Sequence, residues 1–317
     1  MMRLRRGARL LHSLGGVSVG GVDLINPFMT ASGTAGHDVE FSPYMPLHKL
    51  GATTVKSLFH TAWEGNPAPR VHMASSGMMN AVGLQGPGVH TWIEESLPKL
   101  QDAGAVVIAS IWGRTLSEYV SAATQLRAAG NRIAAIEVNL SCPNLEGRTG
   151  IIAHDDVLSA QIIAAVHAES PVPVWAKLSA NTDRIVEIAQ AVVAAGAQSL
   201  TVINTMVGLQ IDVETGRPTL GNGGGGLSGP AIHPIAVRAV FDIRRTIPHV
   251  DIVGVGGIRS GSDAIEMMLA GANAVQVGTA SFADPAATWR IAREAAVLAH
   301  RRGASQWSQI VSAAHAL

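Results

Sequence analysis

Short apolar runs alternate with longer amphipathic segments along most of the chain. The runs are predominantly apolar, and they cover residues 28–31, 52–57, 106–111, 134–141, 174–179, 200–205, 252–256 and 274–279. Between them, apolar residues recur at helical spacing in residues 115–129, 157–168, 183–195, 234–245, 262–270 and 285–302. The pattern predicts strands and helices that follow one another in strict alternation.

This alternation predicts a parallel sheet covered by helices. Strands that are apolar throughout are typical of such sheets, because helices pack against them. Eight strand–helix units close most naturally into a (β/α)8 TIM barrel, and no linker or repeat interrupts them, so we expect a single domain over residues 1–317. A doubly wound open sheet is the structural alternative. Residues 17–25, interrupted at Gly20 and Gly21, predict a small β-hairpin before the barrel.

Two connections are too long for ordinary loops between a strand and a helix. They span residues 60–97, after the second predicted strand, and 206–234, after the sixth. Both leave the C-terminal ends of their strands, where the active sites of barrel enzymes lie. We therefore expect these long active-site loops to form a lid and a ligand cradle.

Composition excludes several classes of protein. Hydrophobic residues make up 47% of the chain, and 23 Lys and Arg balance 23 Asp and Glu, so nothing indicates a nucleic-acid or anionic-membrane partner. The single cysteine excludes an intrachain disulfide, a CxxC redox pair and an iron–sulfur site built from this chain's cysteines alone, which fits a reducing cytoplasm. The basic residues 1–16 lack the apolar core of a signal sequence. They predict a flexible extension or a start codon assigned too early.

The segment Ile136-Glu137-Val138-Asn139-Leu140-Ser141-Cys142-Pro143-Asn144 predicts a buried strand that ends in a loop. Pro143 prevents the strand from continuing, which places Cys142 on that loop, where functional residues concentrate. Asn139 and Asn144 flank the cysteine, and their amides offer both a donor and an acceptor to a planar, imide-like ring. The thiol would then face that ring. The alternative is that Cys142 is a small buried hydrophobic residue.

Other polar residues stand at the C-terminal ends of predicted strands, where a barrel makes them converge. They are Lys56, Ser57, Lys177, Asn204 and Thr205. Lys177 lies inside an otherwise apolar strand, and a buried lysine is costly without a partner, so it predicts a ligand contact. The alternatives are a structural ion pair for Lys177 and a snorkelling surface side chain for Lys56.

Three glycine-rich turns predict contacts with a phosphate group. They are residues 223–229 before a helix, residues 254–257 at the end of the seventh strand, and Gly278-Thr279 at the end of the eighth. Backbone N–H groups near helix N-termini bind phosphate, and barrels commonly hold it after strands seven and eight. The alternative is that these turns need glycine only for their backbone geometry. The histidines are scattered, and no spacing of ligating residues predicts a metal site.

Taken in order, the motifs resemble those of the class 1 dihydroorotate dehydrogenases, which are FMN enzymes of pyrimidine synthesis built on a (β/α)8 barrel. The resemblance runs from residue 17 to the C-terminal helix. Residues 211–215 and 220–222 resemble the 1B subclass, whose electrons pass to NAD⁺ through a separate subunit. The motifs are Ala31-Ser32-Gly33-Thr34, Lys56-Ser57, Gly65-Asn66-Pro67, Asn80-Ala81-Val82-Gly83-Leu84-Gln85, Asn139-Leu140-Ser141-Cys142-Pro143-Asn144, Lys177-Leu178-Ser179, Asn204-Thr205 and Gly226-Leu227-Ser228-Gly229-Pro230.

The resemblance implies roles for individual residues. Cys142 is implied as the base that takes the C5 proton of dihydroorotate while the C6 hydride moves to flavin N5. The residues implied to hold the substrate are Lys56, Asn80, Gly83, Leu84, Asn139, Asn144, Asn204 and Thr205. Those implied to hold FMN are Ser32, Lys56, Ser57, Ser110, Asn139, Lys177, Ile203, Gly229, Gly256, Gly257, Gly278 and Thr279. The implied partner is a subunit with FAD and a 2Fe–2S cluster, joined to a homodimer of this chain in a heterotetramer.

The sequence departs from this family at a few positions. Ser110 stands where the family has a flavin-contacting Asn, and Trp112 stands where it has Ala. Ala180 replaces a Pro, His233 replaces a Lys, and residues 147–150 alter the loop of the catalytic cysteine. Trp112 is large and close to a strand end, so it could reshape the rim of the pocket.

These departures leave three alternatives open. One is a related FMN oxidoreductase that acts on another dihydropyrimidine or cyclic amide. The second is a non-redox lyase or isomerase that binds a phosphate, and the third is a non-catalytic relative kept for assembly. A purified protein with the yellow absorbance of FMN excludes the second.

Overall fold

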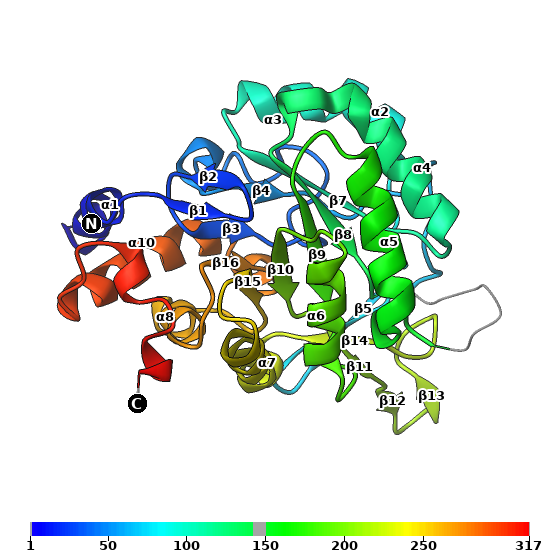
Figure 1. Cartoon of the computed structure of the whole chain (residues 1–317). Coiled ribbons are helices and arrows are strands. Elements are labelled where there is room, and N and C mark those ends of the chain that lie inside the picture. The colour runs from blue at the N-terminus through cyan, green and yellow to red at the C-terminus, as the bar shows by residue number, and fades with distance from the viewer. Residues whose placement is uncertain (1, 142–149, 317) are drawn as a thin grey trace.

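Eight parallel strands form a closed barrel in the computed structural model, which describes residues 2–141 and 150–316 (Figure 1). The strands are β3 (Phe28–Thr30), β4 (Thr53–Thr54), β7 (Val107–Ile111), β8 (Ala135–Asn139), β9 (Val174–Leu178), β10 (Ser199–Val202), β15 (Asp251–Val255) and β16 (Ala274–Val277). They pair in the order β3-β16-β15-β10-β9-β8-β7-β4. A parallel bridge between Met29 and Ala52 joins the two ends of this order and closes the ring. The predicted (β/α)8 barrel is therefore confirmed.

Helices cover the outside of the barrel at the segments that the sequence predicted. They are α4 (Leu116–Leu126), α5 (Asp156–Glu169), α6 (Ile185–Ala194), α7 (His233–Thr246), α8 (Gly261–Leu269) and α10 (Ala287–Arg301). Three shorter helices were not predicted: α2 (Val89–Glu95), α3 (Leu97–Asp102) and α9 (Ala280–Ala283). The 3-10 segments are Leu47–Lys49, Arg127–Arg132, Ile152–His154, Pro230–Ile232, Trp307–Gln309 and Ala313–His315. Side-chain caps fix some of the helix starts, such as the capping box of Ser260 and Asp263 at α8.

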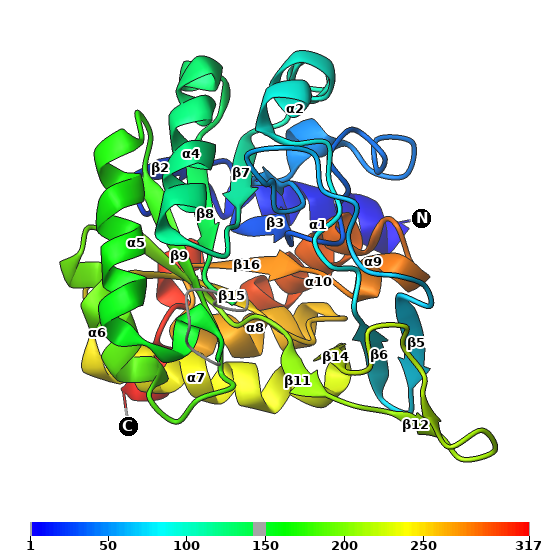
Figure 2. The same ribbon diagram turned by 90° about the vertical axis from the view of Figure 1, so that its right-hand side faces the viewer.

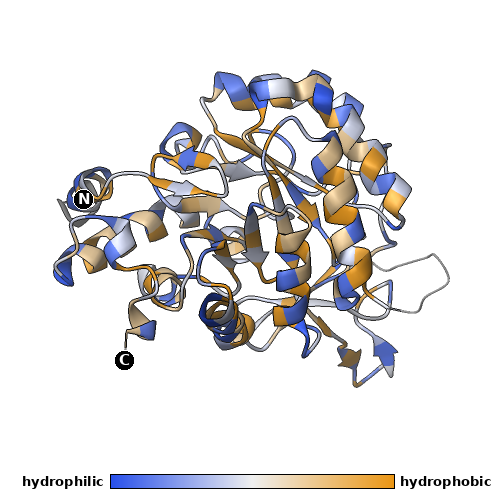
Figure 3. Cartoon of the chain, viewed as in Figure 1, coloured by the Kyte–Doolittle hydropathy of each residue, from blue (hydrophilic) through white to orange (hydrophobic). Residues whose placement is uncertain are grey.

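Apolar residues concentrate on the strands and on the helix faces that pack against them (Figure 3). Trp92, Trp175 and Trp307 are among the largest fully buried side chains. The apolar character of the predicted strands is thus explained by burial on both sides. In the part of the chain that the structure describes, every helix is too short or too polar to cross a membrane.

A two-stranded hairpin closes the N-terminal end of the barrel, as the sequence predicted. Its strands are β1 (Val17–Val19) and β2 (Val22–Leu24), which pair antiparallel. The tip is anchored because Gly20 accepts a hydrogen bond from Nε1 of Trp175 at 3.1 Å, and its N–H donates to Oδ2 of Asp251 at 2.8 Å. A Cβ on Gly20 would lie 2.5 Å from that indole nitrogen, so glycine permits this close approach.

The N-terminal segment differs from the flexible extension that we expected. It forms helix α1 (Met2–Ser13), which lies beside α10 in Figures 1 and 2. Leu11 and Leu14 are buried, and the backbone at Gly7 comes close to Arg293, where a Cβ would lie 2.8 Å from the arginine carbonyl oxygen. Packing against α10 therefore stabilises a 12-residue helix that is too short to be stable alone in water.

The two long connections pair with each other in a second, antiparallel sheet, in the order β11-β14-β6-β5 (Figure 2). Its strands are β5 (Val71–Ala74), β6 (Gly77–Asn80), β11 (Met206–Gly208) and β14 (Gly225–Ser228). Strands β6 and β14 join the two connections, with Asn80 opposite Gly226. A small hairpin, β12 (Ile211–Asp212) with β13 (Arg217–Pro218), extends from it. The sequence predicted these long loops but not their strands.

Candidate active site

A cavity of about 1140 Å³ lies where the C-terminal ends of the barrel strands meet the second sheet. It exceeds the roughly 300–1,000 Å³ of a typical small-molecule site, so it has room for a cofactor and a second ligand. The predicted site residues that line it are Ser32, Lys56, Ser57, Asn80, Gly83, Leu84, Asn139, Lys177, Ile203, Asn204, Thr205, Gly229, Gly256, Gly257, Gly278 and Thr279. Ser110 is fully buried and does not line it. Cys142 and Asn144 lie outside the described residues.

Ser57, Asn139 and Asn204 form a hydrogen-bonded row along the cavity wall. Oγ of Ser57 lies 2.9 Å from Oγ of Ser110 and accepts a 3.4 Å bond from Nδ2 of Asn139. Nδ2 of Asn204 donates to Oδ1 of Asn139 at 3.0 Å, and Oδ1 of Asn204 accepts from the N–H of Thr205 at 2.8 Å. Since each amide has a defined neighbour, the orientation of both amides is determined. Ser110 thus supports the row from behind.

Lys56 occupies a cationic corner of the cavity. Burial lowers the pKa of Lys56, and the nearby charge of Arg70 lowers it further. Arg70 is held by the carbonyl oxygens of Asn66 at 2.5 Å and Glu64 at 3.0 Å, and by the side chain of Gln85. An anionic ligand group in this corner would offset both the lost hydration of Lys56 and its repulsion by Arg70.

His37 lies near this corner but adds no charge to it. Burial lowers the pKa of His37 to about 4, with a further contribution from Lys56, so the imidazole is neutral near neutral pH. Its carbonyl oxygen accepts a 2.8 Å bond from Nε1 of Trp92, which fixes the loop after β3. No pattern in the sequence marked His37.

The loop after β6 is held in one shape at the cavity wall. Leu84 adopts a left-handed backbone with φ of 59°, which is strained for a leucine. Gly83 has φ of 73°, and a Cβ there would lie 2.5 Å from Asn66. Nδ2 of Asn80 donates to the carbonyl oxygen of Gly226 at 3.2 Å and ties the loop to β14. Backbone strain and close packing together indicate an ordered loop that lines a binding site.

Lys177 is both ion-paired and part of the cavity lining. It is 4% exposed, its ammonium donates to Oγ of Ser32 at 2.9 Å, and it lies 3.5 Å from Oε1 of Glu137. The ion pair that we considered as an alternative for Lys177 is therefore present. Glu137 was missed as a functional candidate. Its signal was a carboxylate inside an apolar strand, two residues before Asn139 and so on the same face.

Two glycine turns at the ends of β15 and β16 expose backbone donors to the cavity. The N–H groups of Gly256, Gly257, Gly278 and Thr279 find no hydrogen-bond acceptor among the described residues. Gly257 has φ of 67°, and a Cβ there would lie 2.7 Å from the carbonyl oxygen of Gly229. Four unpaired donors at turns that carry little side-chain bulk match a phosphate group.

The third glycine-rich segment is not the turn that we expected. Residues 225–228 form strand β14, which pairs with β6 and β11. Glycine suits this strand because a Cβ on Gly225 would lie 2.8 Å from Leu220, and one on Gly226 would lie 2.7 Å from Cβ of Thr205. Only Gly229, after the strand, reaches the turn at Gly257. Close packing in the second sheet, rather than a phosphate turn, therefore accounts for most of these glycines.

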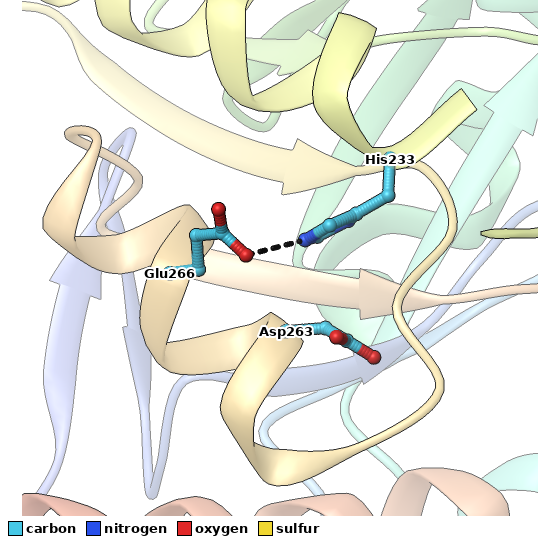
Figure 4. Close-up of side chains that lie close together, drawn as sticks. All are labelled: His233, Asp263 and Glu266. Atoms are coloured by element: carbon cyan, nitrogen blue, oxygen red, sulfur yellow. Dashed lines mark hydrogen bonds and ion pairs between the residues drawn. The ribbon is translucent and has the colours of Figure 1, made fainter. Parts of the chain in front are cut away.

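His233, Asp263 and Glu266 come together near the turn at Gly256, although no spacing in the sequence links the histidine to the two acids (Figure 4). Nδ1 of His233 lies 2.8 Å from the carbonyl oxygen of Gly256, and Nε2 lies 3.3 Å from Oε2 of Glu266. The carboxylate of Asp263 caps α8 by accepting from the N–H groups of Arg259 and Ser260, each at 2.9 Å. Each side chain thus has a structural partner, and the group ties α7 and α8 to the turn.

Trp112 does not shape the cavity rim as we had expected. It is 3% exposed, does not line the cavity, and stacks on Phe59 with ring centroids 4.6 Å apart. Trp63 contacts the Trp112 ring edge-on, with ring centroids 5.6 Å apart, and the guanidinium of Arg114 lies 4.7 Å from the centre of the Trp63 ring. The large indole therefore fills an aromatic cluster outside the cavity, where burial favours it.

Asn181 is a further cavity residue that sequence reasoning missed. Its Nδ2 donates to the carbonyl oxygen of Thr205 at 3.0 Å, and its Oδ1 accepts from the N–H of Val207 at 2.7 Å. These bonds brace the chain that leaves β10 toward the second sheet. The available signal was a polar residue shortly after the end of β9.

Comparison with known proteins gives a consistent result over nearly the whole chain. The family model described as dihydroorotate dehydrogenase matches residues 16–298. The chain is 44% identical over 297 residues to the "Dihydroorotate dehydrogenase B (NAD(+)), catalytic subunit" of Trichlorobacter lovleyi, which covers 94% of this chain and 97% of that protein. It is 44% identical over 299 residues to the protein of the same name from Desulforamulus reducens, covering 94% and 98%. The one from Geobacter sulfurreducens is 44% identical over 278 residues, covering 88% and 90%.

Proposed function

This chain belongs to the dihydroorotate dehydrogenase family, and from that premise we propose that it oxidises dihydroorotate to orotate in pyrimidine synthesis, as an FMN-dependent catalytic subunit of the NAD⁺-linked B type. One observation supports this most directly. A single cavity combines a cationic corner and a row of amides on one wall with unpaired backbone donors on another. That combination suits an anionic, imide-like substrate beside a phosphate-bearing cofactor.

The residues of the cavity fit FMN. The four unpaired N–H groups of Gly256, Gly257, Gly278 and Thr279 would hold its phosphate, with Gly229 beside them. Ser32, Lys56, Ser57, Asn139, Lys177 and Ile203 would hold its ring, and Ser110 would act through its bond to Ser57. When bound, the flavin accepts the hydride that leaves C6 of the substrate. Lys177 would place a positive charge beside the ring, where negative charge develops on reduction.

The substrate would lie between the amides and the cationic corner. Lys56 would pair with the carboxylate of dihydroorotate, and Arg70 adds to the positive potential there. Asn80, Asn139 and Asn204 would match the donors and acceptors of the ring edge. The other residues proposed to contact the substrate are Gly83, Leu84, Asn144 and Thr205.

Cys142 is proposed as the base. The C5 proton of dihydroorotate is next to a carbonyl group, so its removal needs a base placed on one face of the ring. A thiolate can serve if the site lowers the cysteine pKa from its ordinary value of about 8.5. The loss of this proton accompanies the loss of the C6 hydride, which creates the C5–C6 double bond of orotate.

A partner subunit is proposed to take the electrons onward. The chain has one cysteine, already assigned to the base, so it has no second redox site built from its own thiols. The names of the relatives describe a catalytic subunit of an NAD⁺ enzyme. We infer a subunit with FAD and a 2Fe–2S cluster, bound to a homodimer of this chain.

Anaerobic bleaching of the flavin tests the proposal. The purified chain should carry FMN absorbance, and dihydroorotate should bleach it. Dihydrouracil has the same ring without the carboxylate, so it should bleach the flavin poorly if Lys56 and Arg70 recognise that group. A colourless chain that takes up no FMN contradicts the proposed cofactor, and equal bleaching by dihydrouracil contradicts the proposed substrate in favour of a related oxidoreductase.

A further inference from the structure

A buried carboxylate lies directly beneath Lys177 in the barrel interior. Glu137 is fully buried and does not line the cavity, so no ligand in the cavity can touch it. Its Oε2 accepts hydrogen bonds from Oγ1 of Thr201 at 3.0 Å and from Nε2 of Gln276 at 2.8 Å. Gln276 in turn donates to Oγ1 of Thr54 at 3.2 Å. Side chains from β4, β10 and β16 thus fix this carboxylate at the centre of the barrel.

The second oxygen of the carboxylate faces Lys177. Oε1 of Glu137 lies 3.5 Å from the lysine ammonium and, among the described residues, has no hydrogen-bond donor. The ammonium has three N–H donors. One donor bonds to Oγ of Ser32, and the ammonium also faces Oε1 of Glu137. That leaves donor capacity for a group in the cavity that Lys177 lines.

An ion pair at this depth needs an explanation beyond stability. The interior of a TIM barrel is usually filled by branched apolar side chains. A buried ion pair is seldom more stabilising than apolar side chains of the same size, whereas removal of one partner leaves a costly unpaired charge. Retention of the pair therefore points to a requirement for the lysine charge at the cavity floor.

We propose that Glu137 is a positioning residue that holds the Lys177 ammonium, as its counter-charge, against the cofactor side of the cavity. This inference rests on the proposed function, because the cofactor is the group that Lys177 would meet. Glu137 acts only through Lys177. Without the carboxylate, the ammonium keeps Ser32 as its partner among the described residues, so it is no longer held at one point with its charge balanced.

Three variants of the full chain test this role: E137Q, K177M and the double variant E137Q/K177M. Gln keeps the size of Glu and can still accept from Thr201 and Gln276, but it removes the charge. We expect E137Q to weaken FMN binding about tenfold, as for loss of one partner of a buried pair. We also expect a lower midpoint potential of the bound flavin. In the K177M background the same substitution should change neither the FMN affinity nor the flavin potential, because the lysine through which Glu137 acts is absent.

Thermal unfolding of the flavin-free chain gives a readout independent of the cofactor. E137Q should melt at a lower temperature than the double variant, because the double variant has no unpaired buried charge. T201V is the matched control, since it removes one donor to Glu137 without altering a charge, and it should keep FMN affinity within about twofold. If E137Q does not fold, a folded double variant still supports the pairing, and failure of both to fold contradicts it.

The outcomes separate this inference from the proposed function. A wild-type chain that binds no FMN contradicts the proposed function. A wild-type chain that binds FMN, with E137Q unchanged in affinity and potential, contradicts this inference alone. An equal effect of E137Q in the wild-type and K177M backgrounds also contradicts this inference alone. So does a raised midpoint potential of the flavin in E137Q, because it would mean that Lys177 keeps its position and that Glu137 only reduces the effect of its charge.

Discussion

The side-chain amide of Asn204 donates a 3.0 Å hydrogen bond to Oδ1 of Asn139, across β9, at the mouth of the barrel. The same Oδ1 accepts from the N–H of Ser141 at 3.2 Å, so the Asn139 amide is held from two sides. We predict that N204A weakens orotate binding about tenfold, because a partly buried donor is lost and the Asn139 amide loses one of the groups that hold it. Flavin content should be retained. Spectral titration of the flavin with orotate measures the change.

Asn222 offers a matched control for this prediction. It also lines the cavity, but it is exposed and makes no hydrogen bond to the described residues. N222A removes an amide of the same kind without disturbing the row, so orotate affinity should stay within about twofold of wild type. Equal losses in N204A and N222A would show that the Asn204–Asn139 bond has no particular role.

The glycine turn at Gly257 provides a second prediction, on the phosphate. Gly257 has φ of 67°, and an added Cβ would lie 2.7 Å from the carbonyl oxygen of Gly229. G257A therefore distorts the turn whose N–H groups are proposed to hold the phosphate. We expect FMN affinity to fall by about tenfold or more, as for loss of charge-assisted hydrogen bonds. Equilibrium dialysis of the flavin-free chain with FMN measures it.

Gly216 controls for the backbone strain in that variant. It also has φ of 67°, but nothing lies within 4 Å of an added Cβ. G216A thus adds the same strain, about 1 kcal/mol or more, at a site far from the turn. It should lower the melting temperature slightly and leave FMN affinity intact. If G257A binds FMN as tightly as G216A does, the phosphate lies elsewhere.

Lys56 gives a prediction on pH. Burial, and then Arg70, lowers the pKa of Lys56 below its ordinary value of 10.5, so the ammonium loses its proton at a lower pH than an exposed lysine does. Because only the ammonium pairs with the carboxylate of orotate, orotate affinity should fall as pH rises, beginning below that ordinary value. The dissociation constant, measured by titration at increasing pH, should rise accordingly.

K56M tests whether that pH dependence belongs to Lys56. The variant should bind orotate about tenfold or more weakly near neutral pH, since a charge-assisted contact is lost. It should also lose the alkaline fall in affinity. A K56M variant that keeps the same alkaline fall would assign the titration to another group and place the carboxylate away from this corner.

The barrel could be predicted from the sequence because its signals are local. Each strand is a short apolar run, and each covering helix has its own apolar face. The second sheet could not be predicted, because β14 is rich in glycine, a poor strand former, and its partner at Asn80 lies 146 residues from Gly226. The helix before residue 17 also depends on a distant contact, since 12 residues form a marginal helix alone and packing against α10 stabilises it.

The candidate site could be predicted in part because barrels bring strand ends together. Asn139, Lys177 and Asn204 each follow or end an apolar run, so their convergence follows from the fold. Contacts that depend on side-chain direction could not be predicted. The ion pair of Glu137 with Lys177 joins neighbouring strands inside the barrel, and Trp112 turns away from the cavity into an aromatic cluster.

Cys142 carries the fourth prediction, which concerns the proton rather than binding. C142A should lower the rate of flavin bleaching by dihydroorotate about 100- to 10,000-fold, the usual contribution of a general base. Flavin content and orotate binding should change little. C142S should keep a small activity that rises with pH, because an alkoxide forms much less readily than a thiolate. Stopped-flow absorbance measures the bleaching, and wild-type rates in C142A would leave Cys142 as a small hydrophobic residue.

The last prediction follows the electrons beyond this chain. Reduced flavin must be reoxidised, and the one cysteine of this chain cannot bind an iron–sulfur cluster. We therefore expect the purified chain to reduce an artificial dye with dihydroorotate as donor, but to form NADH very slowly when NAD⁺ is the only acceptor. Addition of the subunit with FAD and a 2Fe–2S cluster should start rapid NADH formation. The absorbance of NADH measures this reaction.

The dye assay is the internal control, because it shows that the first half of the reaction is intact whichever acceptor is used. C142A with the partner subunit should form NADH about 100- to 10,000-fold more slowly than the wild type, since both acceptors depend on the same reduced flavin. Rapid NADH formation by the chain alone would contradict the two-subunit proposal, because it would require hydride transfer to NAD⁺ within this cavity. Efficient turnover with fumarate would instead indicate an enzyme that reoxidises its flavin with a second small molecule in place of a partner subunit.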